Sequence, residues 1–262
     1  MKMLSYTIVH KMDEQSIDIA KIIEDKMLLR RDDVRPNIVF TIGGDGTFLR
    51  ACHKYPTATF FGVHTGHLGF YSNFGVADLA SLIESINLNN YKINRIPLLS
   101  VQVCADNTYN FTALNEMTLI CPPRTLRLDV YINDEFFEHF RGTGMCVSTP
   151  SGSTAYNKSL GGAIIDHNIK AMQLTEIAGI NSITYETINS PLVLGPSYQI
   201  ELAAVGRYKN IFLTVDTLSI ELQNFKKLKA YMGNFYVKVG VNENINFISR
   251  IKRSFFEKNH SD

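Results

Sequence analysis

The first hundred residues alternate short apolar runs with stretches in which apolar residues recur every three or four positions. Runs at residues 4–9, 38–42 and 60–63 predict buried strands, and the stretches between them predict crossover helices. Asp13 can cap the first helix. The apolar stripes of the two clearest helices are Ile19, Ile22, Ile23 and Met27, and then Leu79, Leu82, Ile83 and Ile86. Strands and helices in this order favour a Rossmann-like three-layer α/β domain over residues 1–100.

The period changes after residue 100. In residues 126–132 every second residue is apolar, which is the alternation of a half-buried antiparallel strand. Similar short runs occur at residues 109–120, 199–204, 210–222 and 231–241. They predict an all-β sandwich over residues 101–244. The last apolar stretch lies in residues 245–262, and we expect this segment to return to the first domain.

Two segments depart from this alternation. Ile169, Met172 and Glu176 share a helical face, which predicts a helix within residues 169–180. Asn115 and Glu116 interrupt an apolar run at residues 111–120 that predicts a single strand. Because neighbours in a strand point to opposite faces, at least one of the two is expected to face a cleft. The alternative is an ordinary strand with one solvated face.

Composition and charge narrow the class of protein. The 262 residues are 45% hydrophobic and 19% charged, which is ordinary for a folded domain. Lys and Arg number 26 against 25 Asp and Glu, so no global field draws the chain to nucleic acid or to a membrane, and neither is expected as a partner. The four cysteines are widely spaced, without a C-x-x-C pair, and no apolar stretch is long enough for a signal peptide or a membrane span. A cytoplasmic location is expected.

The strongest chemical feature follows the predicted strand at residues 38–42. It is the loop Gly43-Gly44-Asp45-Gly46-Thr47, with a helix predicted over residues 48–54. Glycines let backbone N–H groups approach an anion, and a helix N-terminus adds partial positive charge, so the loop is a candidate phosphate cradle. It is neither a Walker loop nor G-x-G-x-x-G. Asp45 is the candidate general base; the alternative is an Asx-turn at a strand end.

A second cluster lies in residues 148–159, Ser-Thr-Pro-Ser-Gly-Ser-Thr-Ala-Tyr-Asn-Lys-Ser. Its hydroxyls, amide and ammonium could bind ribose and phosphate oxygens, with a flat ring beside Tyr156. By composition alone, a polar surface loop is the alternative. His64 and His67 have H-x-x-H spacing without the Glu of H-E-x-x-H, so no side-chain metal site is expected. Arg250, Lys252 and Arg253 are expected to form a solvated basic face.

Taken in order, five motifs resemble the NAD kinases, most nearly the short enzymes of Gram-positive bacteria. They are the GGDGT loop at residues 43–47, His-Thr-Gly-His-Leu-Gly-Phe-Tyr at 64–71, Leu-Asn-Glu at 114–116, Arg-Gly at 141–142 and the segment 148–159. The resemblance is dense over residues 36–191 and thin beyond, through Asp216. The loop alone is shared with diacylglycerol, sphingosine and phosphofructo-kinases, but the combination is specific.

The resemblance implies transfer of the γ-phosphoryl of ATP to the 2′-hydroxyl of the adenosine ribose of NAD, with Mg²⁺ or another divalent metal bound through the phosphates. It also implies a homo-oligomer, a tetramer with shared active sites. Asp45 is then the proton acceptor, and Gly43, Gly44, Gly46 and Thr47 hold the phosphate donor. The implied NAD-binding residues are Asp45, Gly46, Phe70, Tyr71, Asn115, Glu116, Arg141, Thr143, Ser151, Thr154, Ala155, Tyr156, Asn157, Lys158, Ser159 and Ala178.

Three positions depart from the family pattern. Thr143 stands where an acid is usual, Asp166-His167 where His-Pro is common, and Asn189 where Gly usually precedes Ser-Pro. Two other functions stay open. One is a lipid kinase, which would need a membrane-docking surface that the sequence does not display. The other is a catalytically silent NAD(P)-binding regulator. Inorganic polyphosphate is the alternative phosphoryl donor.

Overall fold

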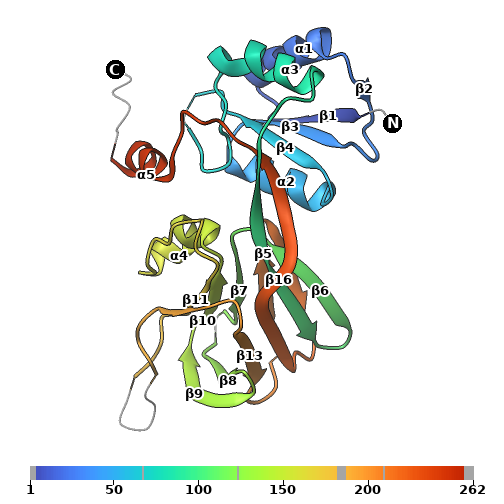
Figure 1. Cartoon of the computed structure of the whole chain (residues 1–262). Coiled ribbons are helices and arrows are strands. Elements are labelled where there is room, and N and C mark those ends of the chain that lie inside the picture. Colours follow the sequence, from blue (N-terminus) through green and yellow to red (C-terminus); the bar gives the residue numbers. More distant parts are fainter. Residues whose placement is uncertain (1–3, 67, 123, 182–186, 209, 257–262) are drawn as a thin grey trace. The chain divides into compact units, whose positions relative to one another are not determined.

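The computed structural model describes residues 4–66, 68–122, 124–181, 187–208 and 210–256. The chain forms two compact units: Met1–Ile96 with Val237–Asp262 is unit 1, and Pro97–Tyr236 is unit 2. Two long strands, β5 (Ile93–Cys104) and β16 (Lys227–Gly240), carry the chain from one unit into the other (Figure 1). Each strand is continuous where it passes between the units, at residues 96 and 236, so no change in the apolar pattern marks these positions. The domain boundaries predicted from the sequence were residues 100 and 244.

Unit 1 is built on a parallel sheet in the order β2-β1-β3-β4-β16. Its strands are β1 (Ser5–His10), β2 (Arg30–Arg31), β3 (Ile38–Ile42), β4 (Thr59–Val63) and the end of β16. All residues of β3 and β4 are buried. A parallel strand covered on both faces shows such a continuous apolar run, and the predicted strand at residues 38–42 is confirmed.

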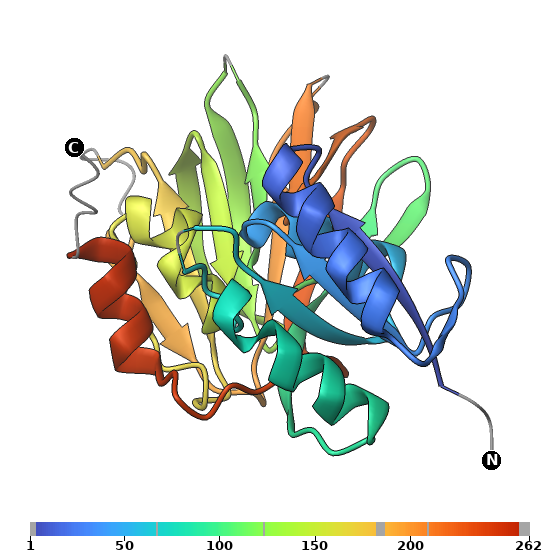
Figure 2. The ribbon, with the colours of Figure 1, turned by 90° about the horizontal axis from the view of Figure 1, so that it is seen from above.

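The helices of unit 1 cover both faces of this sheet, as Figures 1 and 2 show. Alternate residues of β3 and β4, such as Phe40 and Phe61, belong to one core with α1 (Glu14–Lys26) and α3 (Leu79–Asn87). On the other face, the Phe60 ring lies 5.4 Å from that of Phe48 in α2 (Asp45–Lys54). The three-layer α/β prediction is confirmed. A short 3-10 turn (Val76–Asp78) precedes α3, and α5 (Phe247–Phe255) follows β16.

Unit 2 is an antiparallel sandwich, as predicted. One sheet contains β5, β6 (Thr108–Ala113), β8 (Leu126–Ile132), β9 (Glu135–Gly142), β13 (Gln199–Ala204) and β16. The other has the order β12-β11-β10-β7-β14-β15, with β7 (Glu116–Ile120), β10 (Gly144–Ser148), β11 (Met172–Ile177), β12 (Leu192–Leu194), β14 (Ile211–Val215) and β15 (Leu218–Leu222). Inward side chains of both sheets form one core, which includes Leu99, Leu119, Leu128, Phe140, Val147 and Leu202.

Two local predictions are wrong. The segment predicted as a helix within residues 169–180 contains strand β11, in which Met172, Gln173 and Leu174 are all buried. Gln173 is buried because its side-chain amide bonds with the backbone of Ala163. The single strand predicted over residues 111–120 is two strands, β6 and β7, and Asn115 lies in the bend between them.

Two helical segments differ in their bounds or form from the sequence prediction. Helix α2 begins at Asp45, inside the glycine loop, and not at residue 48. The polar segment after β10 forms a 3-10 turn (Ser151–Thr154) and the single helical turn α4 (Tyr156–Ser159).

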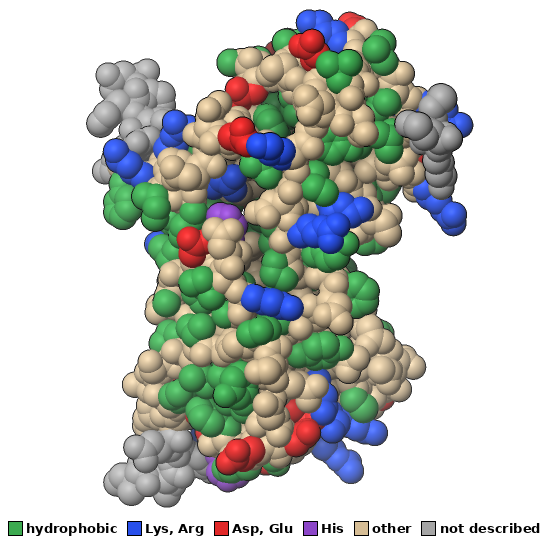
Figure 3. All heavy atoms as spheres, viewed as in Figure 1, with side chains coloured by type: hydrophobic (Ala, Val, Ile, Leu, Met, Phe, Trp, Pro, Cys, Tyr) green, Lys and Arg blue, Asp and Glu red, His purple; other side chains and the backbone are tan. Residues whose placement is uncertain are grey.

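No helix in the described ranges is long and apolar enough to cross a membrane. On the face shown in Figure 3, Lys and Arg side chains lie scattered among hydrophobic and uncharged ones.

Candidate active site

The glycine loop of unit 1 lies where β3 ends and α2 begins. Gly43 has φ +134°, a conformation that other residues rarely adopt, and its N–H bonds to the carbonyl of Val63 in β4 at 3.0 Å. Gly44 is the N-cap of α2, and its carbonyl accepts the N–H of Thr47 at 2.9 Å. The first turn of a helix has backbone N–H groups without helical partners, so the loop presents donors to an anion.

The carboxylate of Asp45 is held by two backbone donors. Its Oδ2 accepts the N–H of Phe70 and its Oδ1 the N–H of Tyr71, each at 3.0 Å. Asp45 is also the first residue of α2, where the helix dipole favours a negative charge. Each carboxylate oxygen has a second lone pair, so the group can still accept a proton. Phe70 and Tyr71, predicted as binding residues, therefore contact the predicted base through their backbone.

The segment against Asp45 has no room for side-chain atoms beside the carboxylate. A Cβ at Gly69 would lie 2.4 Å from Oδ1 of Asp45 and 2.7 Å from Oγ of Ser72. The Ser72 hydroxyl accepts the N–H of Gly69 at 3.1 Å. The Tyr71 ring stacks on Phe48 of α2 at 4.8 Å. These contacts fix the 69–71 segment against the start of α2.

Two arginines lie near this loop, and the sequence placed neither of them in the candidate site. Arg50, one turn along α2, donates to the Thr47 hydroxyl at 3.3 Å. Arg250 in α5 donates from Nη1 to the carbonyl of Phe70. The prediction that Arg250 belongs to a solvated basic face is wrong, because its side chain is half-buried and its Nε is enclosed. Lys252 and Arg253 on the same helix are exposed, as predicted.

In unit 2, Asn115 and Glu116 are held by Asp216, which lies in the turn between β14 and β15. The Asp216 carboxylate accepts the N–H groups of Leu114 at 2.8 Å, Asn115 at 2.7 Å and Glu116 at 3.3 Å. Asp216 has φ +52°, and its own N–H bonds to the carbonyl of Glu116 at 3.0 Å. The strand bend that contains Asn115 is therefore set by a residue far along the chain.

Glu116 faces a cavity of about 310 Å³ lined by Glu116, Thr118, Ile120, Tyr156, Thr214 and Asp216. Burial, with Asp216 as a second and smaller cause, raises the pKa of Glu116 to about 8. Its Oε2 is buried and has no hydrogen-bond partner among the described residues. At neutral pH Glu116 is therefore mainly protonated, and a neutral carboxyl group can donate a hydrogen bond to a ligand.

Residues 148–159 divide into structural and accessible groups. Thr149 donates to the carbonyl of Leu114 at 2.5 Å, Ser153 to that of Pro150 at 2.6 Å, and Asn157 accepts from Thr175 at 2.7 Å. Thr154 bonds back to Ser151 at 3.3 Å. These hydroxyls and this amide shape the segment. The exposed side chains are those of Tyr156, Lys158 and Ser159, with Ser151 and Ala155 partly exposed.

Arg141, Thr143 and Ala178 lie together in unit 2. The N–H of Ile180 bonds to the carbonyl of Arg141 at 2.7 Å, and the N–H of Thr143 to that of Ile177 at 2.9 Å. A Cβ at Gly142 would lie 2.7 Å from the carbonyl of Ala178, so the two backbone segments are in close contact. Ala178 itself has φ +47°.

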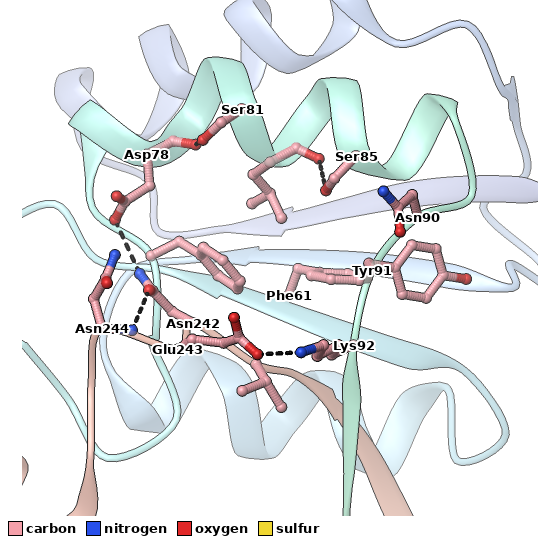
Figure 4. A pocket seen from close by; sticks show the side chains of 13 residues that line it. Phe61, Asp78, Ser81, Ser85, Asn90, Tyr91, Lys92, Asn242, Glu243 and Asn244 are labelled. Atoms are coloured by element: carbon pink, nitrogen blue, oxygen red, sulfur yellow. Dashed lines mark hydrogen bonds and ion pairs between the residues drawn. The ribbon is translucent and has the colours of Figure 1, made fainter.

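Other features of the described residues lie outside these clusters. No group of three or more His, Cys, Asp or Glu side chains there could hold a metal ion. His67, half of the H-x-x-H pair, lies outside the described residues. Unit 1 also has a cavity of about 400 Å³ beneath α3, where Phe61 and Tyr91 lie near the ion pair of Lys92 with Glu243 (Figure 4). None of the predicted site residues lines it.

The molecule is a two-domain protein: a parallel α/β unit with a candidate phosphate loop and a held carboxylate, and a β-sandwich unit. Residues 3–91 match the ATP-NAD kinase N-terminal domain, and residues 114–239 match the ATP-NAD kinase C-terminal domain. The chain belongs to the ATP-NAD kinase family, and the resemblance stated from its motifs is confirmed.

Individual relatives support this family assignment, and solved structures have a similar fold. The NAD kinase of Lactobacillus acidophilus is 35% identical over 99% of this chain and 100% of its own length. That of Lysinibacillus sphaericus is 40% identical over 96% and 98%. The fold is similar to that of the yeast NADH kinase complexed with NADH, with a TM-score of 0.79, 20% identity, and coverage of 98% of this chain and 89% of the other. An NAD kinase from Archaeoglobus fulgidus in complex with ATP has a TM-score of 0.76 at 19% identity, with 95% and 99% covered.

Proposed function

We propose that this protein transfers the γ-phosphoryl of ATP to the 2′-hydroxyl of the adenosine ribose of NAD, forming NADP and ADP, with Asp45 as general base. The observation that carries the proposal is the Asp45 carboxylate, held by two backbone N–H groups at the end of a glycine loop and at the start of α2. Phosphoryl transfer requires mainly positioning and charge stabilisation, which such a loop supplies.

In the proposed reaction the 2′-oxygen attacks the γ-phosphorus, and the bond from that phosphorus to the oxygen bridging to the β-phosphate breaks. The proton of the 2′-hydroxyl passes to the Asp45 carboxylate. Gly43, Gly44, Gly46 and Thr47 form the proposed donor site at the start of α2, where a helix N-terminus favours the phosphates; the N–H groups of Gly43 and Thr47 are themselves bonded to the carbonyls of Val63 and Gly44 and shape the loop. Proton transfer of this kind contributes about 10² to 10⁴ in rate.

We propose that NAD is bound mainly by unit 2. The neutral Glu116 is a hydrogen-bond donor in a cavity of about 310 Å³ that also has the hydroxyls of Thr118, Thr214 and Tyr156. A ribose or an amide offers acceptors of the kind such a group recognises. The proposed NAD-binding set is Asp45, Gly46, Phe70, Tyr71, Asn115, Glu116, Arg141, Thr143, Ser151, Thr154, Ala155, Tyr156, Asn157, Lys158, Ser159 and Ala178.

We propose that the divalent metal, Mg²⁺, is bound mainly by the phosphate oxygens of ATP and not by a cluster of protein side chains. The described residues contain no cluster of three or more metal-binding side chains. Mg²⁺ keeps several waters and is usually held by one or two carboxylates and substrate phosphates, so this lining is compatible with it. When bound, it would neutralise charge on the donor phosphates.

Three further expectations belong to the proposal. The functional domains are residues 1–100 with the returning segment 245–262, which hold the phosphate loop, and residues 101–244, which bind NAD. The protein acts as a homo-oligomer, a tetramer in which neighbouring subunits complete the NAD site. It works in the cytoplasm.

The test is to incubate the purified protein with NAD, ATP and Mg²⁺ and to detect NADP with an NADP-specific dehydrogenase. Wild type should form NADP, and Asp45→Asn should lose a factor of about 10² or more in kcat. Asp18→Asn, on the exposed face of α1, is the matched control and should keep full activity. Polyphosphate in place of ATP identifies the donor. No NADP with either donor would refute the proposal.

A further inference from the structure

One peptide group connects the C-terminal helix to the proposed base. The carbonyl oxygen of Phe70 accepts a hydrogen bond from Nη1 of Arg250, and the N–H of the same peptide, that of Tyr71, donates to Oδ1 of Asp45 at 3.0 Å. The guanidinium, the peptide and the carboxylate thus form a continuous chain of hydrogen bonds. The sequence separation between Arg250 and Phe70 is 180 residues.

Arg250 is half-buried, whereas Lys252 and Arg253 on the same helix are exposed. Burial lowers the pKa of its guanidinium, while the nearby Asp45 and Tyr71 act in the opposite direction. Its Nε is enclosed and makes no hydrogen bond to any described residue. Arg250 also forms no ion pair within 4 Å among the described residues, so its charge acts on this loop through the Phe70 carbonyl and through space. A half-buried guanidinium with an enclosed Nε that makes no hydrogen bond to any described residue costs free energy, and a function of this side chain would account for that cost.

Helix α5 holds Arg250 in position by contacts on both sides. Its N-cap, Asn246, accepts the N–H of Ser249 at 2.8 Å, and the Ser249 hydroxyl accepts the N–H of Asn246 at 3.2 Å. Farther along the helix, the Phe255 ring lies 5.9 Å from the ring of Phe70. Phe70 is therefore in contact with α5 through both its backbone and its side chain.

We infer that Arg250 is a positioning residue for the proposed phosphoryl transfer: through the Phe70–Tyr71 peptide it holds the Asp45 carboxylate in the geometry that receives the proton. A cation on the carbonyl polarises the peptide, which strengthens the N–H donor on its other end. The carboxylate is thereby fixed before substrates bind, which is what positioning contributes to rate. This inference rests on the proposed role of Asp45.

The test uses three substitutions at Arg250 in the full chain. Arg250→Gln removes the charge, Arg250→Met removes charge and donor, and Arg250→Lys keeps a charged donor. With NAD, ATP and Mg²⁺, kcat should fall about 10- to 100-fold for Gln and Met, with each KM within about threefold of wild type. Arg250→Lys should recover most of the activity. Arg253→Gln, the same change on the exposed face of the same helix, is the matched control and should leave kcat unchanged.

A double-mutant cycle with Asp45→Asn separates positioning from other roles. If Arg250 acts through Asp45, adding Arg250→Gln to Asp45→Asn should change the residual rate by no more than about threefold. An equal loss in both backgrounds would mean that Arg250 acts independently, on the phosphates or on the fold, and would overturn the inference. So would a raised KM for ATP with an unchanged kcat.

Two further outcomes keep the inference apart from the proposed function. If wild type forms no NADP, the proposed function is wrong. If Asp45→Asn is as active as wild type, Asp45 is not the base. Thermal unfolding of each variant checks the fold, and if Arg250→Gln does not fold, the cycle is completed with Arg250→Met, which also removes the charge. A folded Arg250→Lys that is as inactive as Arg250→Met, with the loss repeated in the Asp45→Asn background, would also refute the role.

Discussion

The carboxylate of Asp216 accepts the backbone N–H of Asn115 at 2.7 Å, across a sequence separation of 101 residues. With the N–H groups of Leu114 and Glu116 on the same carboxylate, the turn after β14 determines how the Asn-Glu pair is presented. The orientation of a proposed NAD-binding pair therefore depends on a residue about a hundred positions farther along the chain, which lines the same cavity.

Asp216→Asn should weaken both stability and NAD binding. The amide has one acceptor oxygen in place of two, and its NH₂ group would face backbone donors. Hydrogen bonds to a charged group contribute about 1.5–3 kcal/mol each, so we expect a loss of about 2 kcal/mol in the free energy of unfolding and a higher KM for NAD. Urea unfolding and steady-state kinetics measure the two effects. Glu221→Gln, on the exposed side of β15, is the control and should change neither.

Glu116→Gln should stabilise the protein at high pH. The pKa of Glu116 is raised by burial from its usual 4.5 to about 8, so between these values the folded state keeps a proton that the unfolded state has lost. The wild-type free energy of unfolding then falls as pH rises through this window, and the loss is complete above about 8. Gln has no such loss. The variant should match wild type near pH 4 and exceed it by a few kcal/mol at pH 9, on the order of what such a shift implies.

Urea unfolding at several pH values from 4 to 9 gives the difference between the two proteins. A difference that stays constant over this range would show that Glu116 is not held protonated. Thr118→Ser, on the same strand and in the same cavity, controls for local packing and should show no added pH dependence.

Gly69→Ala should abolish most activity without unfolding the protein. The new Cβ would lie 2.4 Å from Oδ1 of Asp45, so the carboxylate has to move from its two N–H donors. We expect a loss of about 10² in kcat, similar to the removal of the base. Gly66→Ala, in the same segment but with no atom within 4 Å of the added Cβ, is the matched control. Equal activity of the two variants would contradict this account of the loop.

The four cysteines should differ in reactivity. Cys52, Cys121 and Cys146 are buried, and burial raises the pKa of the Cys121 and Cys146 thiols. Cys104 is partly exposed at the end of β5. A thiol reagent applied to the folded protein should label Cys104 first, because the thiolate is the reactive form. Mass spectrometry of the labelled peptides locates the site, and Cys104→Ser should remove the fast phase; labelling of Cys146 first would be inconsistent with the fold.

Features encoded by neighbouring residues could be predicted from the sequence. The continuous apolar run of β3 and the alternation of β8 match the observed strands. Asp13 caps α1 by accepting the N–H of Ser16 at 2.8 Å, as its position before an apolar stripe predicted. The glycine loop is equally local, because its glycines and the following helix α2 are adjacent in the chain.

Features that depend on residues elsewhere in the chain could not be predicted from the sequence. The burial of Gln173 in β11 is compensated by hydrogen bonds of its amide with the backbone of Ala163, ten residues away, and no local pattern predicts such a partner. Asp216 and Arg250 lie 101 and 180 residues from the groups that they hold, and no spacing in the sequence connects them. A lone Asp in a turn and an Arg in a basic helix have the local pattern of ordinary surface residues.

The return of residues 237–262 to unit 1 sets an order of completion during synthesis. Sheet pairing between β16 and β4, at Lys238 with Thr59 and Val239 with Phe60, needs residues made after all of unit 2. A nascent chain of 236 residues contains the sequence of unit 2 but lacks the part of β16 that pairs with β4, and Arg250 is not yet made. Because domains fold as units, unit 1, which the chain enters first, is completed only after unit 2, and Arg250 is the last of the residues proposed to act at the glycine loop to be made.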